Sequence, residues 1–274
     1  MKLRKALDKA KENRGENNRS VSVKNKKPPA SSDEWHAPIY SESLAVEINY
    51  QKAIDNHCIA FSPEFPEINY YKVLRTQIRQ MSKTKGWNTV MITSVSPGEG
   101  KTVTAINLAA VFAKEYNQTV LLVDADLKRQ TIHKYLGYHS SHGLIDYLED
   151  KKPLNEIIVW PGVEKLTLIS GGRTVADSAE LLGAPRMQEL VNNLKVRYND
   201  RFIIFDVPPV QGCADALAFA PFVDGIIFVV EVDKPKIQDV KKAMELLPEK
   251  KIAGFVLNRI YDPSGLYGKY GYGY

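Results

Sequence analysis

Short apolar runs alternate with helical stretches along most of this chain, and this alternation limits the possible folds more than any other feature. Strand-like runs are predicted at 89–95, 119–124, 165–170, 202–206, 225–231 and 251–258. Helical periodicity is predicted at 67–81, 102–115, 185–198, 214–221 and 236–247. The runs TVLLVD and GIIFVVE are apolar almost throughout, as in strands that are covered on both faces. The pattern therefore predicts an α/β fold with a doubly wound, mostly parallel sheet flanked by helices.

The two ends of the chain differ from this central region in composition. Residues 1–34 are basic and poor in large apolar groups, and the first 27 residues hold ten Lys or Arg against three Asp or Glu. Such a segment buries too little apolar surface to offset the entropy of ordering, so we predict a disordered basic arm. We predict an extended lead-in at 35–66 and a flexible, tyrosine-rich tail at 261–274.

The segment SPGEGKT at 96–102 lies between a predicted strand and a predicted helix. Gly98 and Gly100 permit left-handed backbone and a close approach of phosphate oxygens to backbone N–H groups. Lys101 is placed to reach the β- and γ-phosphates of a nucleotide. Thr102 is placed to ligate Mg²⁺ at the start of a helix whose dipole favours anions. The strict phosphate-loop spacing asks for a glycine just before this segment, where the chain has valine.

Three carboxylates follow apolar strands. Asp124 and Asp126 end the run LLVDAD, and Asp206 ends the run FIIFD. Ligands of doubly wound sheets bind at the carboxyl ends of the strands, so we expect these acids beside the phosphate loop. A divalent cation would offset their mutual repulsion. The sequence therefore predicts a site for ATP and Mg²⁺.

A row of phenols ends the chain. Five of the 14 tyrosines lie in the last 14 residues, namely Tyr261, Tyr267, Tyr270, Tyr272 and Tyr274. A nucleotide site together with a run of phosphorylatable hydroxyls predicts an enzyme that phosphorylates tyrosines, its own among them.

Other features narrow the setting of the protein. Cys58 and Cys213 are too few for a disulfide framework, and we interpret both as free thiols. The longest apolar runs fall well short of a membrane span, and the charged start lacks the apolar core of a signal peptide. These features predict a cytoplasmic protein. Residues 28–274 hold 27 basic and 29 acidic residues, which argues against nucleic acid as a partner.

The ordered set of motifs resembles the bacterial tyrosine kinases of capsular and exopolysaccharide biosynthesis, in their separate cytoplasmic form. SPGEGKT resembles the Walker A motif of that family, LLVDADLKR its Walker A′ motif and IIFDVPPV its Walker B motif. The segment SAELL at 178–182 resembles a further family stretch, and the similarity covers about residues 60–274. The resemblance implies that residues 67–260 form a P-loop kinase domain. It also implies phosphorylation of the C-terminal tyrosine cluster with ATP and Mg²⁺, between subunits.

The resemblance further implies roles for single residues. Those expected to bind the nucleotide are Pro97, Gly98, Glu99, Gly100, Lys101, Thr102, Val103, Asn258 and Arg259, the last two at the adenine. Thr102, Asp126 and Asp206 are expected to hold Mg²⁺. The expected catalytic set is Lys101, Asp124, Asp126 and Asp206. Within it, Asp124 would receive or orient the proton of a phenol whose pKa is normally about 10.

The resemblance also implies partners. These are a membrane polysaccharide co-polymerase that activates the kinase at the inner face of the cytoplasmic membrane, and further copies of the chain. The basic residues 1–27 would add attraction to anionic lipid of about 1 kcal/mol for each Lys or Arg near the surface. A merely solubilising arm is the alternative.

Two motifs depart from the family pattern. The family has Arg two residues after the second Asp of Walker A′, where this chain has Lys128 followed by Arg129. The self-association pattern Glu-x-x-Arg-x-x-Arg corresponds to Asn69, Lys72 and Arg75, of which only the last matches.

Two other classes of function share parts of this sequence pattern. A partitioning or cell-division ATPase of the Min and Par type shares the predicted sheet, but its phosphate loop carries an additional lysine where this chain has Ser96. A nucleic-acid-binding regulator could use the basic arm and the Tyr/Gly tail to grip single strands.

Overall fold

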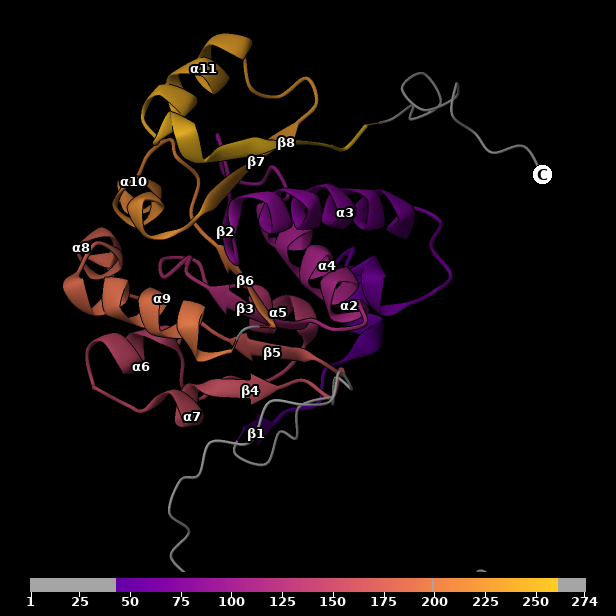
Figure 1. The fold of residues 1–274 in the computed structure, drawn as a ribbon, viewed down its shortest axis with the longest axis vertical. Helices are drawn as coiled ribbons and strands as arrows, with labels where there is room; N and C mark the ends of the chain where they lie inside the picture. The colour runs from indigo at the N-terminus through magenta and orange to yellow at the C-terminus, as the bar shows by residue number, and fades with distance from the viewer. Residues whose placement is uncertain (1–42, 199, 261–274) are drawn as a thin grey trace, which may run out of the picture. The chain divides into compact units, whose positions relative to one another are not determined.

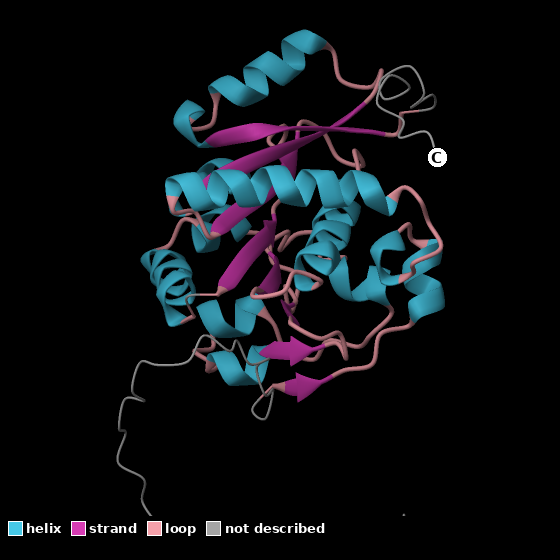
Figure 2. Ribbon diagram, turned by 45° about the vertical axis from the view of Figure 1, so that its right-hand side comes forward, coloured by secondary structure: helices cyan, strands magenta, loops and turns pink. Residues whose placement is uncertain are grey.

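The computed structural model of this protein describes residues 43–198 and 200–260. Within this part of the chain, the strands form one sheet in the order β1-β4-β5-β3-β6-β2-β7-β8 (Figures 1 and 2). All neighbouring strands are parallel except β4 and β5, which confirms the predicted mostly parallel sheet. The strands are Leu44–Ala45 (β1), Thr89–Ser94 (β2), Thr119–Asp124 (β3), Ile158–Trp160 (β4), Leu166–Ile169 (β5), Arg201–Asp206 (β6), Gly225–Glu231 (β7) and Ile252–Asn258 (β8).

Helices cover both faces of the sheet (Figure 1). One face packs against Tyr50–Asp55 (α2), Ile68–Lys85 (α3), Lys101–Ala113 (α4) and Ile132–Leu136 (α5). The other packs against Leu144–Leu148 (α6), Leu154–Ile157 (α7), Ser178–Leu182 (α8), Pro185–Arg197 (α9), Asp215–Phe219 (α10) and Ile237–Glu245 (α11). Short 3₁₀ turns lie at Ile59–Phe61 (η1), Ala220–Phe222 (η2) and Glu249–Lys251 (η3). No described helix combines the length and the apolar character needed to cross a membrane.

Helix α4 is the centre of one of the two cores. It follows the phosphate loop and is buried along almost its whole length between the sheet and α3. Phe112 of α4 stacks on Phe202 of β6 with ring centroids 4.5 Å apart. Arg75 of α3 pairs with Glu115 at 2.8 Å and donates to the Val111 carbonyl at 3.0 Å. The one arginine that matches the self-association pattern is therefore used for packing within this chain.

The main difference from prediction lies in the lead-in. Within the segment predicted to be extended, Tyr50–Asp55 instead form α2 and Ile59–Phe61 form η1. The side chain of Asn49 caps α2 by accepting from the Lys52 backbone N–H at 2.9 Å. Ala53 and Ala60 are fully buried in the core that contains α4. Helices this short gain their stability from such packing rather than from a repeating apolar pattern, so periodicity did not reveal them.

The predicted strands and longer helices agree with the structure to within a few residues. Strands β1 and β4 were not predicted because they are only two and three residues long. The register of the central strands matters most for function. Asp124 at the end of β3 lies directly opposite Asp206 at the end of β6, and Asp206 pairs with Ile92 of β2. The sheet thus brings both acids to the edge from which the phosphate loop leaves β2.

Candidate active site

The loop between β2 and α4 has the conformation that its glycines predict. Gly98 and Gly100 have φ of 82° and 94°, a region that favours glycine. The carboxylate of Glu99 accepts from the backbone N–H groups of Val95 at 2.9 Å and Ser96 at 3.1 Å. Because Glu99 is fully buried and turned toward its own loop, its side chain shapes the loop rather than facing the cavity in front of it.

The end of β8 supports the same loop. The side-chain amide of Asn258 donates to the Glu99 carbonyl at 2.8 Å. The fit is close, because a Cβ added to Gly100 would lie 2.0 Å from Asn258 Nδ2. Arg259 lines the cavity and pairs with Glu231 at 2.9 Å. Of the two residues predicted at the adenine, one braces the loop and the other faces the cavity.

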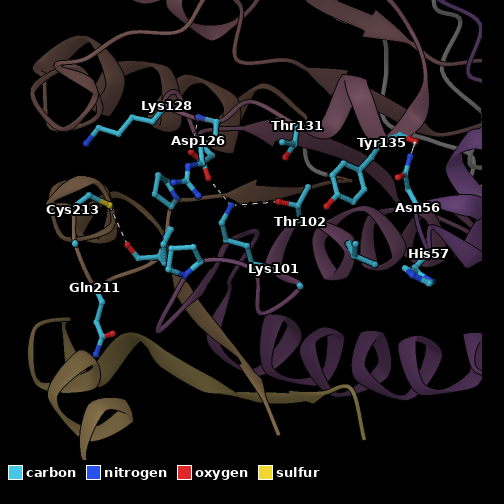
Figure 3. A pocket seen from close by; sticks show the side chains of 18 of the residues that line it. Asn56, His57, Lys101, Thr102, Asp126, Lys128, Thr131, Tyr135, Gln211 and Cys213 are labelled. Carbon is cyan, nitrogen blue, oxygen red and sulfur yellow. Dashed lines mark hydrogen bonds and ion pairs between the residues drawn. The ribbon is translucent and has the colours of Figure 1, made fainter. Parts of the chain in front are cut away.

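The side chains at the start of α4 meet the acids of the strand ends. Lys101 Nζ lies 2.8 Å from Asp126 Oδ2 and 3.3 Å from Asp206 Oδ1. Thr102 Oγ1 donates to Asp206 Oδ2 at 2.6 Å. Figure 3 shows Lys101 pointing toward both Asp126 and Thr102. The structure therefore brings together all four of these predicted residues.

Asp124 lies behind this group. Its Oδ1 accepts from the Asp126 N–H at 3.2 Å, and its Oδ2 accepts from the N–H groups of Thr131 at 3.0 Å and Ile132 at 3.1 Å. The residue is fully buried and does not line the cavity. In this arrangement Asp124 holds the segment that carries Asp126.

The negative charge of the carboxylates at the strand ends is only partly balanced by the positive charge of Lys101. Burial and the neighbouring charge of Asp206 raise the pKa of Asp124 from 3.8 to about 7. Burial also raises the pKa of Asp206, although Lys101 opposes the shift. Burial disfavours the Lys101 ammonium, but Asp206 and Asp126 outweigh it and hold the pKa of Lys101 above its usual range. A bound cation would relieve this excess.

A cavity of about 610 Å³ opens in front of these residues (Figure 3). From the predicted set it is lined by Pro97, Gly98, Gly100, Lys101, Thr102, Val103, Asp126 and Arg259. Its other lining residues were not predicted to form the site: Asp55, Asn56, His57, Lys128, Arg129, Thr131, Tyr135, Pro208, Pro209, Gln211, Gly212 and Cys213. The double proline directly after Asp206 was a usable signal for the 208–213 loop. No local signal pointed to α2, which docks where Asn56 donates to the Tyr135 carbonyl at 3.2 Å.

Comparison with known proteins places this site in a family. Residues 88–249 match a family described as an AAA domain. The tyrosine-protein kinase YwqD of Bacillus subtilis is 32% identical over 232 residues, which are 83% of this chain and 97% of YwqD. The chain belongs to the bacterial tyrosine kinases. The putative tyrosine-protein kinase EpsB of Ralstonia nicotianae is 30% identical over 213 residues. These residues are 77% of this kinase but only 28% of EpsB.

Solved structures agree with this assignment. The kinase domain of the Escherichia coli tyrosine kinase Etk superposes with a TM-score of 0.69 at 26% identity, over 87% of this kinase and 95% of that chain. The septum-site-determining protein MinD of Pyrococcus horikoshii superposes with a TM-score of 0.54 at 23% identity, over 66% and 76% of the two chains, and so shares the fold alone. The alternative of a Min-type ATPase thus has the same fold, and the sequence relatives decide for the kinase. The P-loop NTPase fold supports ATP binding by the kinase.

The donor atoms beside the loop suit Mg²⁺. Thr102, Asp126 and Asp206 supply a hydroxyl and two carboxylates, all oxygen ligands. In the described part of the kinase, no group of three or more His, Cys, Asp or Glu side chains could hold a metal by itself. In proteins Mg²⁺ usually takes one or two carboxylates and completes its shell with water and phosphate. The predicted acceptors Tyr261, Tyr267, Tyr270, Tyr272 and Tyr274 lie outside the described residues, as does the basic arm 1–34.

Proposed function

We propose that this kinase transfers the γ-phosphoryl group of ATP, with Mg²⁺, to the tyrosines of its own C-terminal cluster, and that the acceptor tail belongs to a neighbouring subunit. One observation carries the proposal. At the end of the phosphate loop, the side chains of Lys101 and Thr102 contact the carboxylates of Asp126 and Asp206, with donor–acceptor distances of 3.3 Å or less. Phosphoryl transfer needs little covalent help from the protein, so positioning and charge compensation account for most of the catalysis.

The residues around the loop take separate parts in this reaction. Backbone N–H groups between Pro97 and Val103 hold the phosphates, and Lys101 turns from its two carboxylates toward the β- and γ-phosphates. Bound by Thr102, Asp126 and Asp206, Mg²⁺ would neutralise charge on the transferring phosphoryl group. Asn258, at the end of β8, braces the loop, and Arg259, directly after β8, lies toward the base.

Asp124 acts on the reaction through Asp126, which it holds in place. Three backbone N–H groups occupy its carboxylate, and its side chain is fully buried. We therefore propose that it orients the catalytic segment. Direct acceptance of the tyrosine proton would require the 125–132 segment to move away from it.

We further propose that the kinase acts in the control of capsular or exopolysaccharide assembly at the inner face of the cytoplasmic membrane. The resemblance in the motifs supports this context, together with a membrane co-polymerase as activator and self-association as the source of the neighbouring tail. The basic residues 1–27 favour an anionic lipid surface. Weak activity of the purified chain alone, and stimulation by the cytoplasmic segment of such a partner, are the expected results.

The test measures phosphotyrosine by mass spectrometry on purified protein with ATP and Mg²⁺. Wild type should incorporate phosphate in the C-terminal cluster, and Lys101→Met should incorporate none. A variant with Phe at all five tail tyrosines should keep ATP affinity and lose most incorporation. Mixing Lys101→Met, which keeps an intact tail, with the Phe variant, which keeps an intact site, should restore phosphorylation in trans. Undiminished incorporation in Lys101→Met would refute the kinase site, and no incorporation in the mixture would refute transfer between subunits.

A further inference from the structure

The end of the cavity beside Lys101, where the phosphoryl group is transferred, needs more positive charge than Lys101 supplies. Asp126 and Asp206 both contact Lys101, and a triphosphate would add about four further negative charges. Lys101 and one Mg²⁺ offset only part of this total. Transfer also spreads charge over the γ-phosphoryl oxygens, and related reactions place an additional cation there. Two adjacent residues on the cavity wall, Lys128 and Arg129, could provide it.

Lys128 is already committed to another group. Its Nζ lies 3.0 Å from Asp215 Oδ2, and Asp215, at the start of α10, is fully buried. The other carboxylate oxygen accepts from the hydroxyl of Ser178, at the start of α8. Pulling Lys128 toward a phosphate would leave the buried carboxylate of Asp215 without its counter-charge, which is costly. We refer to Ser178, Asp215 and Lys128 together as the anchor.

Arg129 is in the opposite situation. Its side chain lines the cavity and is exposed, and it forms no ion pair or hydrogen bond with any residue in 43–198 or 200–260. Its backbone is nevertheless fixed, because its N–H donates both to Asp126 Oδ1 at 3.1 Å and to the Asp126 carbonyl at 3.0 Å. Arg129 is thus tied on one side to the carboxylate that contacts Lys101, and on the other side it follows the anchored Lys128.

We propose that Arg129 is a catalytic residue that contacts the transferred γ-phosphoryl group, and that the anchor positions it. The inference rests on the proposed transfer from Mg²⁺-bound ATP. A guanidinium suits the task, because it stays charged and can bind two phosphate oxygens at once. In this chain the residue two positions after Asp126 therefore holds the segment in place, and the next residue acts on the substrate.

The first test compares Arg129→Met and Arg129→Lys with wild type in the full chain. We expect Arg129→Met to lower kcat by at least about 100-fold, since an arginine at this position of a phosphoryl-transfer site contributes roughly 10³–10⁵-fold. Arg129→Lys should retain part of the rate. Calorimetry should show ADP affinity unchanged within about twofold and weaker binding of the β,γ-imido analogue of ATP, because only the analogue carries a γ-phosphoryl group. Wild-type kcat in Arg129→Met, or an unchanged ratio of analogue to ADP affinity, would overturn the assignment.

The second test asks whether the anchor acts through Arg129. Lys128→Met, Ser178→Ala and Asp215→Asn should each lower kcat while leaving ADP affinity unchanged, and Lys128→Arg, which can still pair with Asp215, should restore most of the rate. In the Arg129→Met background these substitutions should have no further effect on kcat. Multiplying effects would overturn the positioning role, even if Asp215→Asn also lowers the unfolding temperature. A wild-type protein that transfers no phosphate at all would instead refute the proposed function, so the two failures are distinguishable.

Discussion

The contact between Gly100 and Asn258 allows a quantitative test of how the phosphate loop is supported. Alanine at position 100 must adopt a φ of 94°, which costs about 1–2 kcal/mol for a residue with a Cβ. The new Cβ would also lie 2.0 Å from Asn258 Nδ2, so the amide must move and its hydrogen bond to Glu99 is lost, at about 1 kcal/mol. We therefore expect Gly100→Ala to lower the free energy of unfolding by about 2–3 kcal/mol.

A double-mutant cycle separates these two contributions. Asn258→Ala alone should cost about 1 kcal/mol, the hydrogen bond to Glu99. The hydrogen bond to Glu99 is already lost in Gly100→Ala, so removing the Asn258 side chain as well should add nothing, and the double variant should cost about 2–3 kcal/mol, the same as Gly100→Ala alone. The assay is urea unfolding followed by circular dichroism, without nucleotide. Additive losses, about 3–4 kcal/mol in the double variant, would show that Asn258 does not support the loop through this contact.

Three further predictions concern the acids, the metal and the core. Burial and Asp206 raise the pKa of Asp124 from 3.8 to about 7, so the folded protein binds this proton more tightly than the unfolded chain does. Without nucleotide and in EDTA, the free energy of unfolding should therefore fall by up to about 4 kcal/mol as pH rises from about 4 to about 7. Urea titrations should show this slope reduced in Asp124→Asn, and parallel profiles would contradict it. EDTA should abolish transfer, and Thr102→Ala should raise the Mg²⁺ concentration needed for half-maximal transfer; an unchanged requirement excludes Thr102 as a ligand. Phe112→Ala should cost about 3–5 kcal/mol in urea unfolding, because it empties a fully buried site against Phe202, and a loss below about 1 kcal/mol would contradict that packing.

The sequence by itself determined the sheet and the centre of the site, because both depend on short-range patterns. A buried parallel strand is a continuous apolar run, and a phosphate loop is a local strand–loop–helix unit in which glycine spacing sets the backbone. The convergence of Lys101, Asp126 and Asp206 followed from a general rule, since parallel strands end at the same edge of a sheet. These parts needed no knowledge of which distant residues touch.

Only the tertiary structure decided which residues support that centre, because their contacts join segments far apart in the chain. Lys128 and Asp215 are 87 positions apart, and Asn258 reaches Glu99 across 159. The motif alone could not show that Lys128 faces a buried carboxylate while Arg129 faces the cavity, since the two residues are adjacent and carry the same charge. The short helix α2 became a wall of the site because Asn56 meets α5 across 79 positions. Each of these contacts depends on how distant elements pack, and packing is decided by the whole fold.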